Sequence, residues 1–166
     1  FLGNFIPFFL ISWSELYIQS NTAGLLMSVA PIFALILAHF MTNDDKFSFD
    51  KLFAVIIGFI GILFIFGFDS LFGLFKNNLH LVLPKLAVVL AVFGYVLSSV
   101  LAYNIKKIEV TTLTTFVTIS AAITSLPFML YVELNNPSVP SSNSLICLAY
   151  LGLFPTAIAF MLRFYI

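Results

Sequence analysis

Charged side chains are scarce in this sequence: Asp, Glu, Lys and Arg make up 8% of the 166 residues, whereas 61% are hydrophobic. A soluble domain carries about 25% charged residues. Because so few charges do not cover a water-facing surface, we expect the lipid bilayer to be the solvent for most of the chain. The seven basic and seven acidic residues balance to a net charge of zero. This balance gives nucleic-acid binding no electrostatic support.

Cysteine and catalytic motifs are also lacking. Cys147 is the single cysteine, which excludes an intrachain disulfide and a multi-cysteine metal site. His39 and His80 are isolated, and neither has the spacing of a metal ligand. The chain has no Gly-x-Ser-x-Gly, phosphate-binding glycine loop or His-Glu-x-x-His sequence. We therefore predict no catalytic residues, no metal and no cofactor, and we do not expect an enzyme.

Long apolar runs are present instead. Residues 22–41 and 49–68 flank one short polar turn, and each run is long enough to cross a hydrocarbon layer of about 30 Å as a helix. Similar runs occupy 1–17, 84–104, 111–133 and the segment after Ser144. The pattern predicts an all-α fold, a polytopic transmembrane helical bundle with about six spans.

Polar residues at the ends of these runs predict where the helices begin. Asn21 or Thr22, Ser48 and Ser144 are expected to cap the second, third and sixth helices. Pro84 is expected in the first turn of the fourth helix. Residues 70–83 mix apolar and polar side chains and are predicted to form an interfacial connector.

Basic residues in the loops predict the orientation of a multi-pass protein. One side of the predicted bundle collects five of the seven basic residues, and the opposite side holds two. By the positive-inside rule the first group faces the cytoplasm. That group is Lys46, Lys51, Lys106, Lys107 and Arg163, and the second is Lys76 and Lys85.

Several motifs resemble one family. The stretch AGLLMSVAPIFA, residues 23–34, is similar to the fourth-helix signature of the EamA branch of the drug/metabolite transporter superfamily. Residues 45–48, DKFS, stand where that family usually has Gly-Glu, a basic residue, an apolar residue and Ser or Thr. Residues 58–62 and 152–160 are similar to its fifth and eighth helices, although Pro155 replaces a commoner glycine.

The resemblance implies a fold of ten helices in two inverted five-helix repeats. Residues 1–69 would then be the C-terminal part of the first repeat and residues 84–166 the N-terminal part of the second, so that the chain is a fragment. It also implies a bacterial inner-membrane transporter, an exporter, that moves amino acids or related small metabolites by alternating access.

Prolines and polar residues inside the spans are candidates for the substrate path. Pro7, Pro31, Pro127 and Pro155 fall within predicted spans, where proline kinks a helix. Transporters line their routes where helices are broken, although membrane helices also tolerate proline generally. The predicted path residues are Asn4, Trp13, Ser28, Pro31, Tyr95, Ser99, Thr118 and Arg163.

Two of these choices have a plainer alternative. Arg163 is the one charge well inside an apolar run, and it either faces an anionic substrate or extends to the lipid headgroups. The hydroxyl residues from Thr111 to Ser125 form one stripe at helical spacing. They either line the path or bond to carbonyls of their own helix.

Small residues predict close helix packing. Ala54, Gly58 and Gly61 give the third helix a thin face that another helix can approach. A homodimer contact is one use of this face. The alternative function is a non-transporting membrane scaffold or assembly subunit that uses the same surface.

Overall fold

The computed structural model describes residues 2–42, 46–67, 79–103, 109–135, 137 and 139–158. Most of these residues are helical and none forms a strand, which confirms the predicted all-α fold. Helices long and apolar enough to cross a membrane number four in this part of the chain, namely Ser20–Met41, Phe49–Phe66, Leu79–Tyr103 and Thr111–Asn135. They occupy the second to fifth predicted spans.

The first and sixth predicted spans hold shorter apolar helices, at Phe5–Ser14 and Ser142–Pro155. Ten residues of helix cover about 15 Å, roughly half of a hydrocarbon layer. The first helix is therefore shorter than the expected 1–17, because residues 2–4 and 15–17 form turns.

The chain divides into two compact units, Phe1–Lys106 and Lys107–Ile166, which are described separately. This division reflects contacts within each unit. The predicted boundary at residues 70–83 instead separates two structural repeats, whatever contacts they make. The repeat boundary stays a prediction, and most of the connector lies outside the described residues.

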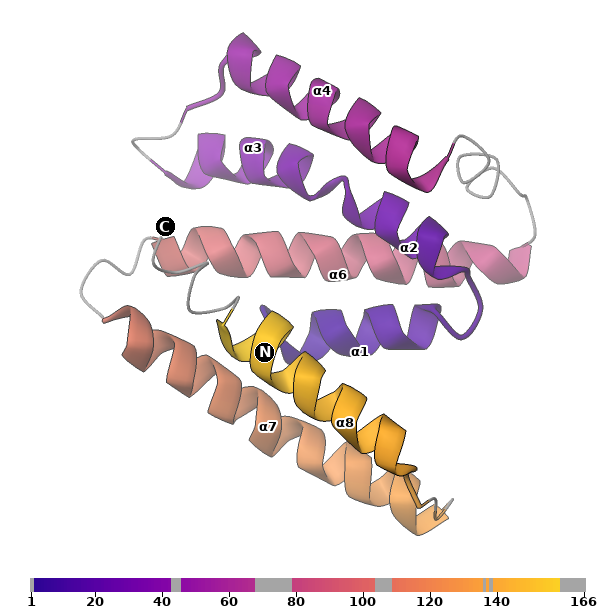
Figure 1. The fold of residues 1–166 in the computed structure, drawn as a ribbon. Helices are drawn as coiled ribbons and strands as arrows, with labels where there is room; N and C mark the ends of the chain where they lie inside the picture. Colours follow the sequence, from indigo (N-terminus) through magenta and orange to yellow (C-terminus); the bar gives the residue numbers. More distant parts are fainter. Residues whose placement is uncertain are drawn as a thin grey trace. The chain divides into compact units, whose positions relative to one another are not determined.

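The first unit is arranged in layers around α6 (Leu79–Tyr103). On one side of α6 lies α1 (Phe5–Ser14), and on the other lie α2 (Ser20–Met27) and α3 (Ala30–Met41) (Figure 1). Beyond α2 and α3 lies α4 (Phe49–Phe66). Of the four long helices α6 is by far the most buried, so it forms the centre of this unit.

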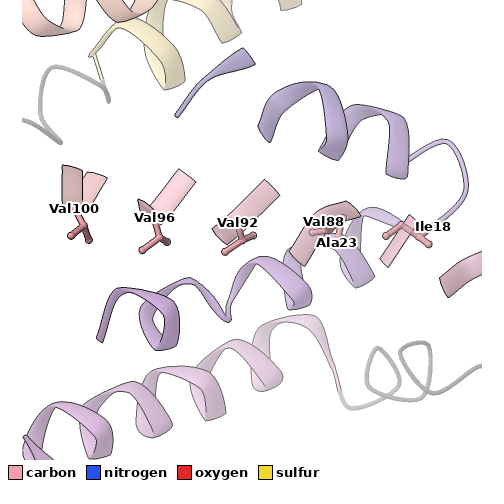
Figure 2. Close-up of a cluster of buried hydrophobic side chains, with 6 residues drawn as sticks. All are labelled: Ile18, Ala23, Val88, Val92, Val96 and Val100. Atoms are coloured by element: carbon pink, nitrogen blue, oxygen red, sulfur yellow. The ribbon is translucent and has the colours of Figure 1, made fainter. Parts of the chain in front are cut away.

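A row of valines on α6 forms the core of the first unit. These side chains recur every four residues, which places them on one face of a helix. They cluster with Ile18 and Ala23 (Figure 2). Partly buried residues of α2 and α3, including Leu26 and Phe33, pack against the cluster. The row consists of Val88, Val92, Val96 and Val100.

Small residues bring α1 and α6 into close contact. A Cβ atom added to Gly94 would lie 3.3 Å from the backbone oxygen of Leu2. One added to Gly3 would collide with the side chain of Ser98. The close approach of α6 to the start of α1 therefore depends on glycine both on α6 and in the turn before α1.

The predicted helix at 22–41 is interrupted, which confirms the expected effect of Pro31. The first half ends at Met27 and the second begins at Ala30. Pro31 occupies the first turn of α3, where a missing N–H group removes no hydrogen bond. The predicted cap at Asn21 or Thr22 is wrong, since the helix begins at Ser20 with Gln19 as N-cap and no side-chain cap bond. Thr22 is buried instead.

The other predicted helix starts have mixed outcomes. The Ser48 cap is confirmed, because its Oγ accepts a hydrogen bond from the backbone N–H of Lys51 at 3.3 Å. The predicted start near Pro84 is wrong, since α6 begins at Leu79. Leu81 packs against the core, which favours helix on the N-terminal side of Pro84. Pro84 lies near the start of α6, where the missing N–H group removes few helical hydrogen bonds.

In the second unit α7 (Val110–Asn135) matches the predicted helix at 111–133 and runs on through Pro127. A π-helix, η1 (Gly152–Ile158), contains Pro155 and follows α8 (Ser142–Leu151) directly. The cap of α8 is Ser141 and not Ser144, because Ser141 Oγ accepts the N–H of Ser144 at 3.2 Å.

Pro7 does not interrupt its helix, contrary to the prediction. It lies at the third position of α1, and the first four N–H groups of a helix have no partner within it. The predicted kink at Pro7 is therefore wrong. Proline is compatible with the regular start of this helix.

Apolar side chains cover the outside of α4. Phe49, Phe64 and Ile65 are 81%, 72% and 80% exposed, and no residue of the helix is buried. An apolar surface of this extent is unfavourable in water and suited to lipid. Together with the four long apolar helices it identifies a multi-pass membrane protein.

Candidate functional site

A pocket of about 420 Å³ lies between α3 and α6. Small-molecule sites in proteins have volumes of about 300–1,000 Å³. The α3 side and the residue after its end contribute Pro31, Ala34, Leu35, Ala38 and Thr42. The α6 side contributes Ser99, Val100 and Tyr103. The lining combines small apolar groups with three hydroxyls and contains no charged residue among those described.

The spacing of the α3 residues explains the room in the pocket. Pro31, Ala34, Ala38 and Thr42 are three and four residues apart, so they lie above one another on one helix face. Their side chains are short, and the facing helix does not fill the space left between them. The face spans about 16 Å along the helix axis.

One end of the pocket lies where both helices end. Thr42 follows the last residue of α3, and Tyr103 is the last residue of α6. Because both residues line the same pocket, the two helices run in the same direction and end side by side. The pocket therefore extends from the break before Pro31 to these two helix ends.

Two hydroxyl groups in the pocket donate hydrogen bonds to carbonyl oxygens of their own helices. Ser99 Oγ donates to the carbonyl oxygen of Tyr95 at 3.1 Å. Thr42 Oγ1 donates to the carbonyl oxygen of Ala38 at 2.7 Å. A hydroxyl group has one hydrogen and two acceptor sites. The Ser99 oxygen, which lines the pocket, therefore keeps acceptor sites beside the hydrogen that it donates.

A hydrogen-bonded turn joins α3 to α4 next to this end of the pocket. His39 Nδ1 accepts the backbone N–H of Phe47 at 3.2 Å, and Lys46 Nζ donates to the His39 carbonyl oxygen at 3.2 Å. Lys51 Nζ in turn donates to the Lys46 carbonyl oxygen at 2.9 Å. These contacts fix where α4 begins relative to the end of α3.

The structure brings two of the predicted path residues together, Pro31 and Ser99. Tyr95 lies one turn before Ser99 and is half-buried, and its carbonyl oxygen orients the Ser99 hydroxyl. Ser28 lies at the break between α2 and α3, where its Oγ bonds to the Leu25 carbonyl oxygen. Neither Tyr95 nor Ser28 lines the pocket.

Asn4 is a buried polar residue at the start of α1. Its side chain is 4% exposed, and no described group donates a hydrogen bond to its Oδ1. A buried acceptor without a donor costs about 1–3 kcal/mol. Such a group often has a functional role or binds a water molecule.

The remaining predicted path residues are not placed at the pocket by the described part of the chain. Trp13 is near the end of α1 and packs on Tyr17, with ring centroids 5.2 Å apart. Thr118 belongs to the second unit. Arg163 lies outside the described residues. Their roles stay predictions.

The hydroxyl stripe of α7 bonds to its own helix. Thr115 Oγ1 donates to the Thr111 carbonyl oxygen at 2.7 Å, and Thr118 Oγ1 donates to that of Thr114 at 2.8 Å. Ser125 makes a similar bond at 2.9 Å. These bonds favour the plainer of the two interpretations of the stripe.

The thin face of α4 is open. No atom lies within 4 Å of a Cβ built on Gly58 or Gly61, and Ala54 is exposed. Within the first unit no described helix packs on this face. The packing role of Ala54, Gly58 and Gly61 therefore stays a prediction.

Sequence reasoning missed six residues of the pocket. They are Ala34, Leu35, Ala38, Thr42, Val100 and Tyr103. The signal for Ala34, Ala38 and Thr42 was present, since small residues follow Pro31 at steps of three and four. Tyr103 gave no such signal, because its position depends on where α6 lies against α3.

The first part of the chain is similar to a known protein family. Residues 1–67 match the EamA-like transporter family, which confirms the resemblance over α1 to α4. No curated protein and no solved structure shows a significant match. The matched segment contains the α3 wall of the pocket, and the family points to a membrane transporter rather than an enzyme.

Proposed function

We propose that this protein, whose residues 1–67 match the EamA-like transporter family, carries small metabolites such as amino acids or related compounds across a bacterial inner membrane. The observation that supports the proposal most is the pocket between α3 and α6. One wall belongs to the family-matched segment, and it begins at the break in a membrane-spanning helix. Broken helices are typical of binding sites in transporters.

The proposed direction is export by alternating access. Lys46 lies between α3 and α4, and Lys51 lies in the first turn of α4. The positive-inside rule assigns this end of the two helices to the cytoplasm. The helix ends at Thr42 and Tyr103 then face the cytoplasm. A pocket reached from this side suits a protein that collects its substrate inside the cell.

Transport by the full-length protein in proteoliposomes tests this function. Radiolabelled amino acids and small metabolites are screened with wild-type protein and with two tryptophan variants. Ala38→Trp places a large side chain in the pocket, whereas Ile36→Trp alters an exposed position of α3 outside the lining. We expect transport to be lost in the first variant and retained in the second. Equal transport by both folded variants would contradict a role for the pocket.

The alternative is a membrane scaffold that associates through the open face of α4. The observation in its favour is the space at Gly58 and Gly61. A scaffold needs no pocket, so transport that depends on Ala38 would exclude it as the main function. Absence of transport, with specific crosslinking through Gly58→Cys, would favour it.

A further inference from the structure

We infer that the break between α2 and α3 binds the ammonium group of an amine or amino-acid substrate through the backbone carbonyl oxygens of Met27 and Ser28. The inference rests on the proposed function, because it assigns a substrate class to one end of the same pocket. It follows from the hydrogen bonds around the break and from the depth of the break in a membrane span.

The break deprives two carbonyl oxygens of the donors that a regular helix would give them. In an α-helix each carbonyl oxygen accepts the N–H group of the residue four positions later. For Met27 that residue is Pro31, which has no N–H group. For Ser28 it is Ile32, whose N–H donates instead to the Val29 carbonyl oxygen at 3.0 Å. Both carbonyl oxygens therefore keep lone pairs for another donor.

Other hydrogen bonds hold the break in shape. Ser28 Oγ donates to the Leu25 carbonyl oxygen. The N–H of Val29 donates to the Leu26 carbonyl oxygen at 3.3 Å. The carbonyls just before the break thus have partners, and the backbone that presents the next two is fixed. A site that is already ordered loses less entropy when it binds a ligand.

The two carbonyl groups point toward α3. Ser28 and Val29 keep right-handed helical backbone angles, so α3 follows α2 in the same general direction (Figure 1). Carbonyl groups of such a helix point toward its C-terminal end. Met27 lies four residues before Pro31 and therefore on the same helix face. Because Pro31 lines the pocket, a group bound to the Met27 carbonyl oxygen would lie beside this end of the pocket.

The break lies deep in a membrane span. The span covers Ser20–Met41, and Ser28 is about 12 Å from one end and about 20 Å from the other. An unpaired carbonyl group is strongly unfavourable in hydrocarbon, so irregular backbone at this depth is buried in protein or lines a cavity. Transporters use carbonyl groups at broken helices to coordinate cations. The position of the break thus suits a binding site.

An ammonium group suits two neighbouring carbonyl oxygens better than a hydroxyl group or a divalent metal ion does. It has three N–H donors, whereas a hydroxyl has one hydrogen, and a charged donor makes hydrogen bonds about twice as strong. Divalent ions take about six or more oxygen ligands. The apolar body of such a substrate would lie along Ala34 and Ala38, which continue the pocket wall from Pro31.

Protection of an engineered cysteine tests this inference in the full-length protein. The native Cys147 is free and exposed, so Cys147→Ser provides the background. Ala34→Cys then reports on the pocket about one turn from Pro31. Phe40→Cys, at a position of α3 that is 80% exposed and outside the lining, is the matched control.

The probes are benzylamine and benzyl alcohol, which share a ring and differ in the attached group. At neutral pH benzylamine carries an ammonium group. Each probe is titrated against the rate at which a methanethiosulfonate reagent labels Ala34→Cys. We expect benzylamine to halve this rate at about one tenth of the concentration that the alcohol needs, because its hydrogen bonds are charge-assisted. The Phe40→Cys rate should not change with either probe.

Pro31→Ala separates the break from the rest of the pocket. Alanine supplies the N–H group that the Met27 carbonyl oxygen lacks, and it favours a continuous helix. The advantage of benzylamine should be lost in this variant. Protection by benzyl alcohol should remain, which shows that the pocket is intact. Ile32→Ala changes the next side chain, outside the lining, and leaves its N–H group in place. This control should keep the advantage.

Three results would overturn the inference: equal protection by the two probes, no protection by either, or an advantage of benzylamine that persists in Pro31→Ala. Weaker protection by benzylamine when sodium chloride replaces potassium chloride at equal ionic strength would also overturn it, because the carbonyls would then hold sodium. The expected advantage without transport of any compound would contradict the proposed function alone. Transport that depends on Ala38 and is inhibited equally by both probes would contradict only this inference.

Discussion

Gly3, two residues before the start of α1, lies directly against Ser98 of α6, and no space is left there for an added methyl group. A Cβ atom on Gly3 would come within 2.8 Å of the Ser98 Cβ and closer still to its Oγ. The Ser98 Cβ is fixed to its backbone and cannot turn away. This contact makes the α1–α6 packing sensitive to a single methyl group.

Gly3→Ala should therefore destabilise the protein by about 1–3 kcal/mol, which is the usual effect of overpacking. The measurement is the thermal midpoint of the purified full-length protein in detergent. The double variant Gly3→Ala/Ser98→Gly removes the colliding side chain and should recover most of the loss. A single variant as stable as wild type would show that the two helices separate easily.

Gly58→Ala should have the opposite effect. No atom lies within 4 Å of the added methyl group, and alanine is favoured over glycine in a helix by about 1 kcal/mol. We expect a thermal midpoint equal to or above that of wild type. A clear decrease would show that another helix packs on this face in the intact protein, as the spacing of Ala54, Gly58 and Gly61 predicts.

Asn4→Leu should raise stability and impair transport. The variant replaces a buried acceptor that has no described donor with an apolar side chain of similar size. Removing the unpaired group should stabilise by up to about 1–3 kcal/mol. If Asn4 belongs to the path, the transport rate in proteoliposomes should fall although the protein is more stable.

The exposed Asn21 provides the control for this variant. Asn21→Leu should change neither property appreciably, because surface substitutions usually shift stability by less than about 0.5 kcal/mol. A loss of stability in Asn4→Leu would mean that Asn4 has a donor in the intact protein. Unchanged transport would remove Asn4 from the path.

His39→Ala should loosen the turn between α3 and α4. The variant leaves the N–H of Phe47 without its acceptor, which is Nδ1 of His39 at 3.2 Å. Loss of one such hydrogen bond should speed amide exchange of Phe47 about two- to tenfold. His39→Asn offers an oxygen in place of Nδ1 and should restore most of the protection. Equal exchange in wild type and both variants would contradict a role for His39 in closing the turn.

Local signals predicted some helix boundaries and missed others. Ser48 was identified correctly because a serine before an apolar run is a local cap signal. Ser144 was assigned wrongly because three serines, Ser141, Ser142 and Ser144, compete within four residues. The start of α6 was missed because Leu81 is helical through its packing against the core, and Pro84 suggested a later start.

The sequence indicates only one of the two walls of the pocket. Pro31 and the small residues after it mark one wall. The opposite wall depends on which face of α6 meets α3, and several faces of α6 are apolar. No pattern along the chain selects Ser99 and Tyr103 over their neighbours.

The sequence by itself determined that this chain is helical and spans a bilayer. The content of charged residues and the length of the apolar segments can both be read directly from the order of the amino acids. The interruption at Pro31 also followed from the chemistry of one residue. Only the tertiary structure decided which helix is central and where a pocket forms. Those outcomes depend on residues distant in sequence that come together in the fold. Gly3 lies against Ser98, and Ala38 and Val100 line the same pocket.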